Sequence, residues 1–200
     1  MKYTNLLVGT NNAHKVREIA AILHETGVRV VTPKELGITN EPEENGATFA
    51  ENALIKARYY AMQGAVPCLA DDSGLAVDAL DGRPGIYSAR YAPTDAECIA
   101  RLLDEMRDIP AEKRTARFVC AAALCMPDGL EIVEIGTCEG QIASAPRGSN
   151  GFGYDPVFYL PDLDCTMSEI SAEEKNTRSH RGNALAAMKP HLMRLFATAQ

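Results

Sequence analysis

The alternation of strand-like and helix-like stretches at the start of the chain restricts its fold more than any other feature. Residues 6–9 form a short apolar run, typical of a buried strand. Between 13 and 25, apolar residues recur three and four positions apart, as on one face of a helix, and residues 28–31 form a second apolar run. A strand, a helix and a strand in this order predict an α/β fold with helical crossovers.

The rest of the chain continues this mixture of elements. Thr48 and Thr94 each precede a glutamate by three positions, the capping-box pattern that predicts a helix start. A last helix is predicted over most of 182–198, with Pro190 kinking or dividing it. Further apolar runs predict strands at 67–70, 75–77, 117–125, 130–137 and 157–160. Pro127-Asp128-Gly129 joins two of these strands in a predicted hairpin, so we expect a mixed sheet.

The composition excludes several classes of protein. A chain of 200 residues, 46% of them hydrophobic, is long enough for about one domain with a sizeable core. Its net charge of −7 argues against nucleic-acid and membrane partners. The sequence contains neither an apolar run of the ~20 residues that a membrane span needs nor a signal-peptide core, so we expect a cytoplasmic protein. None of the six cysteines forms a C-x-x-C pair, which favours reduced thiols.

The first candidate functional segment is residues 9–15, Gly-Thr-Asn-Asn-Ala-His-Lys. It follows a predicted strand and opens a predicted helix, where free backbone N–H groups can bind an anion. Lys15 lies about one turn into that helix. The segment is not a Walker A loop, because the second glycine and the Ser/Thr after the lysine are missing. The simpler interpretation is an Asn12 N-cap before an amphipathic helix.

Acidic residues form the second candidate. Glu41, Glu43 and Glu44 lie in a predicted loop, and Asp71-Asp72 lie between two predicted short strands. Carboxylate oxygens suit Mg²⁺, which takes one or two protein carboxylates together with water and substrate phosphates. The alternatives are a turn at residues 71–74 and a solvated glutamate loop.

Two later segments supply aromatic and basic groups. In residues 148–156, glycines on both sides of Phe152 would let a flat ligand stack on the ring, although a bulged turn would use the same residues. Residues 175–183 are rich in hydrogen-bond donors, which phosphate and base-edge recognition both require. Taken alone, His180 is more often structural.

Together these segments resemble a known family. The motifs that carry the resemblance are Thr10-x-Asn12-x-x-Lys15, Asp71-Asp72-Ser73-Gly74-Leu75, Gly151-Phe152-Gly153-Tyr154-Asp155-Pro156 and Ser179-His180-Arg181-Gly182. Their order is similar to that of the inosine triphosphate pyrophosphatase (Ham1-like) family, and the similarity extends from about Leu6 to the last helix. Ser149-Asn150 departs from the Thr-Gly of many relatives, which affects the expected loop shape more than the reaction.

The resemblance implies a fold, a reaction and an assembly. The fold would be α/β, with a long central mixed sheet, flanking helices and two lobes around an active-site cleft. Residues 1–200 would form one two-lobed nucleotide pyrophosphatase domain. The reaction would be Mg²⁺-dependent hydrolysis of deaminated purine nucleoside triphosphates (ITP, dITP, XTP) to the monophosphate and pyrophosphate, cleansing the nucleotide pool. The protein would be a homodimer.

The resemblance also implies roles for individual residues. Asp72 would bind Mg²⁺ and accept a proton from the attacking water, with Glu43 or its neighbour Glu44 as a second acid at the metal. Ser73 would contact the substrate, and Lys56 would point toward the phosphates. The triphosphate would be held by Thr10, Asn11, Asn12, Ala13, His14 and Lys15. The base and sugar would be held by Phe152, Gly153, Tyr154 and Asp155, and the nucleotide site completed by Lys175, His180 and Arg181.

Two other functions compete with this one. A Maf-like nucleotide pyrophosphatase would run a similar reaction with a different base preference, and a nucleotide-binding module would run none. A module has no need for a base at Asp72, so this residue distinguishes binding from catalysis. The donors of Ser179 to Arg181 further predict a preference for purines with a 6-keto acceptor.

Overall fold

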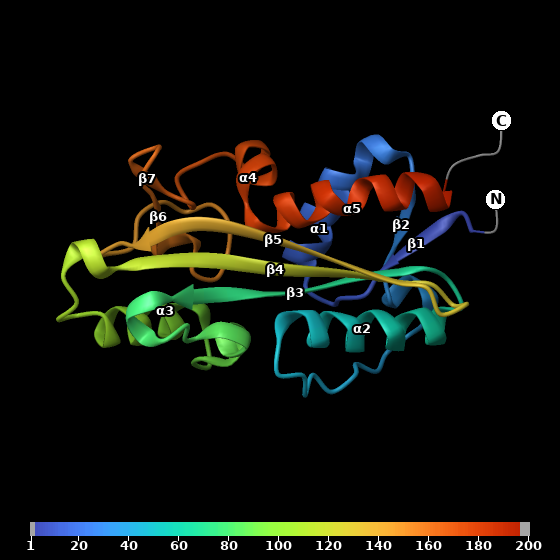
Figure 1. Ribbon diagram of the computed structural model, residues 1–200, viewed down its shortest axis with the longest axis horizontal. Helices are drawn as coiled ribbons and strands as arrows, with labels where there is room; N and C mark the ends of the chain where they lie inside the picture. The colour runs from blue at the N-terminus through green and yellow to red at the C-terminus, as the bar shows by residue number, and fades with distance from the viewer. Residues whose placement is uncertain (1–2, 197–200) are drawn as a thin grey trace. The chain divides into compact units, whose positions relative to one another are not determined.

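The computed structural model describes residues 3–196 of the chain. These residues form two compact units, each assembled from separate stretches of sequence. Unit 1 contains the chain up to residue 72, residues 120–136 and the chain from residue 181 onward, and unit 2 contains residues 73–119 and 137–180. Three long strands contribute residues to both units, namely β3 (Cys68–Val77), β4 (Thr115–Cys125) and β5 (Glu131–Ile142) (Figure 1).

The strands form one mixed sheet in the order β2-β1-β3-β4-β5-β6-β7. β1 (Asn5–Val8) pairs in parallel with β2 (Arg29–Val31) and with β3, because a helical crossover returns the chain each time. β6 (Phe158–Leu160) pairs in antiparallel fashion with β5 and with β7 (Cys165–Thr166). The prediction of an α/β fold with a mixed sheet is therefore confirmed.

Unit 1 has three layers. Helices α1 (Ala13–Leu23) and α5 (His180–Phe196) cover one face of its strands, and α2 (Phe49–Gly64) covers the other (Figure 1). Side chains of a strand alternate between faces, so Leu69 packs with α1 and α5 whereas its neighbour Ala70 packs with α2. Both faces are apolar because both are covered by helices.

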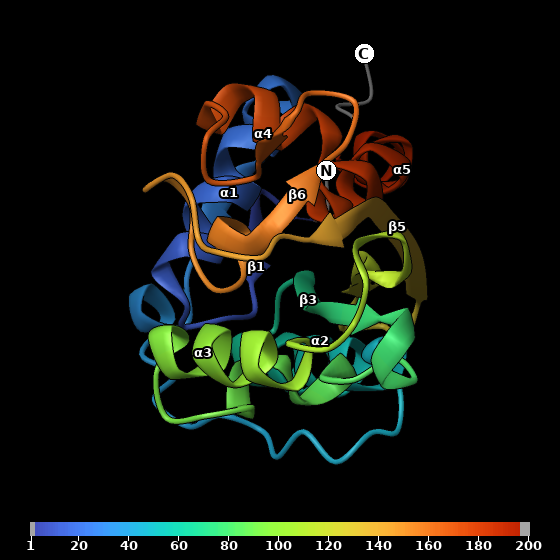
Figure 2. The ribbon, with the colours of Figure 1, turned by 90° about the vertical axis from the view of Figure 1, so that its left-hand side faces the viewer.

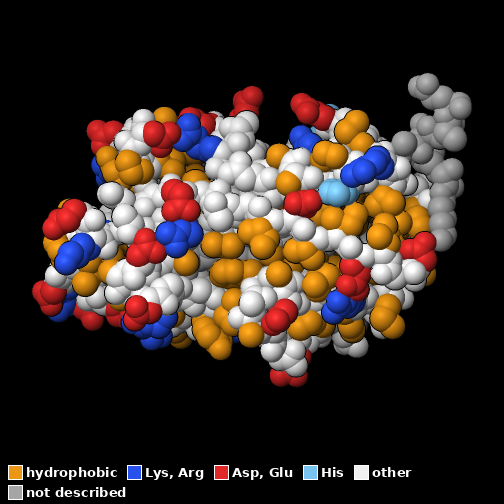
Figure 3. Space-filling view, in the orientation of Figure 1, with side chains coloured by type: hydrophobic (Ala, Val, Ile, Leu, Met, Phe, Trp, Pro, Cys, Tyr) orange, Lys and Arg blue, Asp and Glu red, His pale blue; other side chains and the backbone are white. Residues whose placement is uncertain are grey.

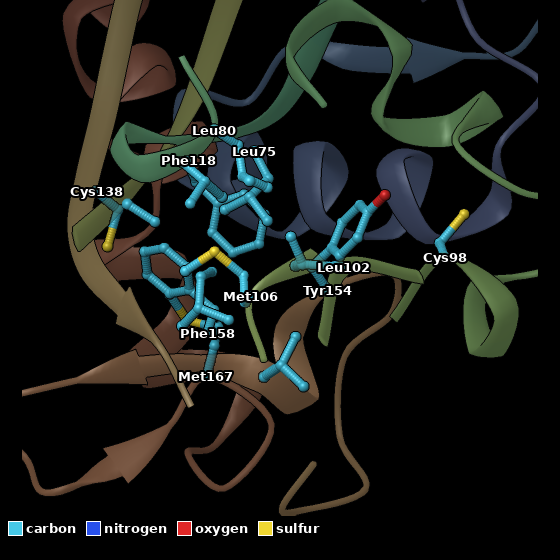
Figure 4. Packing of buried hydrophobic residues seen from close by; sticks show 14 of the residues in the cluster. Leu75, Leu80, Cys98, Leu102, Met106, Phe118, Cys138, Tyr154, Phe158 and Met167 are labelled. Atoms are coloured by element: carbon cyan, nitrogen blue, oxygen red, sulfur yellow. The ribbon is translucent and has the colours of Figure 1, made fainter. Parts of the chain in front are cut away.

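Unit 2 has a hydrophobic core of its own. Figure 2 shows α3 (Asp95–Glu105) on one side of β6 and α4 (Ala172–Arg178) on the other. The rings of Phe118 and Phe158 have their centroids 4.3 Å apart, beside Met106 (Figure 4). This packing joins β4 to β6 in the core of unit 2.

The predicted helix starts are correct. The Thr48 hydroxyl accepts a hydrogen bond from the Glu51 amide at 3.1 Å, and the Thr94 hydroxyl accepts one from the Glu97 amide at 3.2 Å. Short 3₁₀ segments complete the secondary structure, at His24–Thr26, Lys34–Leu36, Asp78–Leu80, Gly85–Arg90, Ala111–Lys113 and Asp155–Val157. All six cysteines are free thiols, as expected. Every helix in the described part of the chain is too short or too polar to cross a membrane.

Two predictions at the site segments are wrong. Residues 71–74 are not a turn between two strands but the middle of β3, which runs unbroken from Cys68 to Val77. The strand continues because the two aspartates find cationic and amide partners on both faces of the sheet, so their burial is compensated. The predicted elements also missed α4, which precedes α5, although Ser171 and Glu174 form the same capping-box pattern as at Thr48, and the last helix starts at His180 rather than at 182. Pro190 lies inside α5, and residues 197–198 of the predicted helix lie outside the described residues.

Candidate active site

Asp71 lies on the face of β3 that α1 and α5 cover. Its carboxylate oxygen Oδ2 is 2.9 Å from Nη2 of Arg181 and 3.1 Å from Nζ of Lys15. Arg181 is itself buried and also donates to Glu18 of α1. Burial acts to raise the pKa of Asp71, but the charges of Lys15 and Arg181 outweigh it and hold this pKa well below its ordinary value. Asp71 therefore stays in its ionised, carboxylate form.

Asp72 points to the opposite face, toward α2. Its Oδ1 lies 3.2 Å from Nζ of Lys56, and its Oδ2 accepts a hydrogen bond from Nδ2 of Asn52 at 3.3 Å. Burial raises the pKa of Asp72 above its ordinary value, although the charge of Lys56 opposes the shift. Of the two adjacent acids, Asp72 is thus the better proton acceptor.

Lys56 joins a second acid to Asp72. Its Nζ lies 2.6 Å from Oε2 of Glu44, which is half-buried, whereas Glu43 is exposed. Of the two glutamates left open by the sequence, the structure brings Glu44 to Asp72.

This pair of acids fits a magnesium ion. Two carboxylates already converge on one cation, the Lys56 ammonium, and both offer the oxygen ligands that Mg²⁺ requires. Among residues 3–196 there is no group of three His, Cys, Asp or Glu side chains that could hold a metal ion. Mg²⁺ can be held by one or two protein carboxylates, with water and substrate phosphates completing its shell.

The segment 9–15 connects β1 to α1. Asn12 caps the helix, because its Oδ1 accepts hydrogen bonds from the amides of His14 at 2.9 Å and Lys15 at 3.2 Å. A Cβ at Gly9 would lie 2.8 Å from Cys68 Sγ and from the Tyr60 ring, so only glycine fits there. The interpretation of Asn12 as an N-cap is confirmed.

The side chains of this segment do not all lie against β3. The side chains of Asn11, Asn12, Ala13 and His14 are exposed, and that of Thr10 is half-buried. Asn11 donates to Glu41 at 2.5 Å, and Thr10 accepts from the Asn12 amide at 3.1 Å. From this segment, Lys15 reaches Asp71, with its Nζ 3.1 Å from Oδ2. Binding of the triphosphate by these residues stays a prediction.

In unit 2, the glycine-rich loop closes around Asp155. This buried carboxylate accepts hydrogen bonds from Lys175 Nζ at 2.6 Å and from the Phe152 amide at 2.8 Å. Gly151 has φ +77°, and a Cβ there would lie 2.0 Å from Asp155 Oδ2. Lys175 Nζ also lies 4.7 Å from the centroid of the half-buried Phe152 ring. The buried ion pair thus holds the centre of the loop, and Asn150, which donates to the Ile170 carbonyl at 3.1 Å, holds its start.

The other residues predicted in unit 2 differ in burial. Tyr154 packs in the core, and its hydroxyl donates to the Ser88 carbonyl at 3.0 Å (Figure 4). Burial raises the pKa of this phenol above its ordinary value. The His180 ring stacks on Phe118 with centroids 4.7 Å apart. Gly153 and Ser73 are half-buried.

Sequence reasoning missed several residues at these sites. Asn52 contacts Asp72, and the Asp95 carboxylate accepts a hydrogen bond from the Gly153 amide at 3.0 Å. Asn52 carries a usable signal, because an asparagine among the apolar residues of a helix face is unfavourable without a partner. The sequence around Asp95 contains no comparable signal.

The fold and these sites define a class of protein. It is an α/β protein in which acids and lysines meet at Asp71 and Asp72, the last residues of the central strand β3 that belong to unit 1. The chain belongs to the Ham1 family, whose sequence model matches residues 6–191. The family resemblance expected from the motifs is therefore confirmed.

Individual relatives agree over nearly the whole chain. A dITP/XTP pyrophosphatase of Geobacillus kaustophilus is 50% identical, covering 92% of this chain and 91% of its own. One from Geobacter sulfurreducens is 48% identical, over 94% and 96%. A HAM1 protein from Coxiella burnetii superimposes with a TM-score of 0.87 at 40% identity, covering 96% of this chain and all of its own. These likenesses extend across both units.

Proposed function

We propose that this protein hydrolyses the deaminated purine nucleoside triphosphates dITP, XTP and ITP to the monophosphate and pyrophosphate, and so clears them from the nucleotide pool. The observation that carries the proposal is the convergence of Asp72 and Glu44 on Lys56 in a chain whose relatives are dITP/XTP pyrophosphatases. The products require that the bond between the α- and β-phosphates is broken. Two acids and a lysine match a substrate that carries both a metal and several negative charges.

Asp72 and Glu44 would hold Mg²⁺. When bound, the ion would polarise the phosphoryl oxygens and offset their charge. Asp72 would accept the proton of the attacking water, a role that suits its raised pKa. Lys56 would keep one of its oxygens oriented.

Lysines would carry the remaining phosphate charge. Lys15 is partly exposed beside Asp71, at the start of a helix whose backbone dipole favours anions. Its charge would act on groups that are anionic before and during reaction, so its effect would be divided between KM and kcat. Lys56 would be shared between the acids and the phosphates.

The base would stack on Phe152. The ion pair of Asp155 with Lys175 supports this role, because it holds the loop that carries the ring. Tyr154 would act from the core as an anchor, and the nucleotide contact expected of His180 stays a prediction, since its ring is buried against Phe118. The selectivity expected of Arg181 stays a prediction, since its guanidinium contacts Asp71 and Glu18. Nothing observed favours a Maf-like enzyme or a binding module.

A homodimer and a cytoplasmic location also stay predictions. Figure 3 shows hydrophobic side chains gathered over β5, and unit 1 exposes Met62, Leu130 and Ile135. Such side chains are available for a subunit contact. Light scattering coupled to size-exclusion chromatography measures the mass directly, and a monomer at working concentration would contradict the expected homodimer.

The reaction is tested with a nucleotide panel. We expect pyrophosphate release from ITP, dITP and XTP to exceed that from ATP and GTP by orders of magnitude, to stop in EDTA and to return with Mg²⁺. Equal rates on ATP would contradict the substrate class, and hydrolysis that resists chelation would contradict the metal site. Binding without pyrophosphate release would identify a nucleotide-binding module.

A further inference from the structure

We propose that Asn52 is a positioning residue that holds the acids Asp72 and Glu44 in register for a divalent cation. The inference rests on the proposed function and adds a residue to its machinery. Asn52 lies in the first turn of α2, and only 1% of its surface is exposed.

The Asn52 amide makes two hydrogen bonds to two different segments. Its Oδ1 accepts from the backbone amide of Gly46 at 2.8 Å, and its Nδ2 donates to Oδ2 of Asp72 at 3.3 Å. The orientation of the amide follows from its partners, because a backbone N–H can only donate and a carboxylate can only accept. The side chain therefore has a defined direction from the loop to the strand.

Each hydrogen bond fixes one of the two acids. Gly46 is two residues after Glu44, so the first bond anchors the loop that presents Glu44. A Cβ at Gly46 would lie 2.7 Å from Glu51 Cβ and 2.8 Å from Asn52 Oδ1, so this loop is held directly against the start of α2. The second bond occupies Oδ2 of Asp72 and leaves Oδ1 to Lys56.

The Asn52 side chain is also neutral, which suits a position beside two acids. Asp72 and Glu44 share a single ammonium group, so a third acid at position 52 would add like charge beside Asp72. An apolar residue would leave the Gly46 amide and Asp72 Oδ2 without this partner. Asparagine is the residue that can accept from the loop and donate to the strand without changing the charge.

Two substitutions separate these effects. Asn52→Leu keeps the approximate volume and removes both bonds. Asn52→Asp keeps an acceptor for Gly46 and loses the donor to Asp72. Outer-shell partners of metal ligands are typically worth 10–100-fold in affinity or activity. We therefore expect Asn52→Leu to lower kcat by about 10–100-fold, with the KM for ITP changed by less than about threefold, because Asn52 is assigned no contact with the nucleotide.

The affinity for a divalent cation is measured separately, without catalysis. Mn²⁺ alone is titrated into the wild type and into Asn52→Leu, and free Mn²⁺ is measured by electron paramagnetic resonance. We expect the variant to bind Mn²⁺ about 10–100-fold more weakly. Asn52→Asp is compared by kcat alone, and a loss like that of Asn52→Leu assigns the effect to the Asp72 side of the amide, where this substitution removes the donor and adds a negative charge.

Thr48→Ala provides the matched control. It removes the cap of the same helix without touching either acid, so it should lower Tm by about 2–4 °C and leave kcat and Mn²⁺ affinity unchanged. If Asn52→Leu lowers only Tm, the proposal is overturned. If Asn52→Leu does not fold, Asn52→Asp decides through its kcat. A wild type that hydrolyses none of the nucleotides overturns the proposed function, whereas the Mn²⁺ titration still tests Asn52.

Discussion

The adjacent aspartates Asp71 and Asp72 lie on opposite faces of β3 and differ in their charged partners. On the α1–α5 face, Asp71 and Glu18 meet Lys15 and Arg181, so two carboxylates are matched by two cations. On the α2 face, Asp72 and Glu44 share Lys56, so two carboxylates are matched by one cation. Counted by these contacts, the first face has as many cations as carboxylates and the second has one cation fewer, while the charge of Lys15 also acts on Asp72.

The pKa directions follow the same division. Asp71 titrates below its ordinary value because its cations outweigh its burial, and Asp72 titrates above its ordinary value because its burial outweighs Lys56. A carboxyl held firmly in its charged form suits structure, whereas one with a raised pKa suits proton transfer. The comparison thus separates an acid held by charge pairing, Asp71, from an acid suited to proton transfer, Asp72, within one strand.

The largest effect is expected from Asp72→Asn. The amide keeps the size of the side chain but cannot accept the proton of the attacking water, so kcat should fall by about 10²–10⁴-fold. Pyrophosphate release at saturating ITP measures the loss, and circular dichroism checks that the fold survives. A variant that turns over near the wild-type rate would remove Asp72 from the mechanism and erase the distinction between the faces.

Asp71→Ala should act on stability instead. Removing one partner of a buried ion pair leaves Arg181 without its charge partner on β3 and typically costs about 3–5 kcal/mol. Urea unfolding followed by circular dichroism gives the free energy of unfolding, with Asp72→Ala as the comparison. Should both alanine variants lose equal stability, the two faces would be structurally equivalent.

A smaller effect tests which of the two glutamates, Glu44 or Glu43, binds the metal ion. Glu44→Gln removes one of the acids that share Lys56, so the Mg²⁺ concentration for half-maximal rate should rise at least about tenfold. Glu43→Gln, at the exposed neighbour, should shift it much less. The reverse order, measured by Mg²⁺ titration at fixed ITP, would give the metal role to Glu43.

Local patterns in the sequence were sufficient for most of the framework. Capping boxes located α2 and α3, apolar periodicity located α1, and a proline–glycine turn located the β4–β5 hairpin. Each of these signals depends on residues within a few positions of one another. The family, too, could be identified from short motifs in order, and it carried the expectation of the reaction.

The continuity of β3 was decided only by tertiary structure. Two adjacent aspartates favour a turn in any local analysis, because isolated charges are costly to bury. The partners that keep Asp71 inside the sheet lie far along the chain, 56 positions away for Lys15 and 110 positions away for Arg181. Likewise, the choice between Glu43 and Glu44 and the role of Asn52 depend on which side chains reach Lys56 and Asp72 after α2 has packed on the sheet. Spacing along the chain cannot encode those distances, because they arise from packing between segments that the sequence keeps apart.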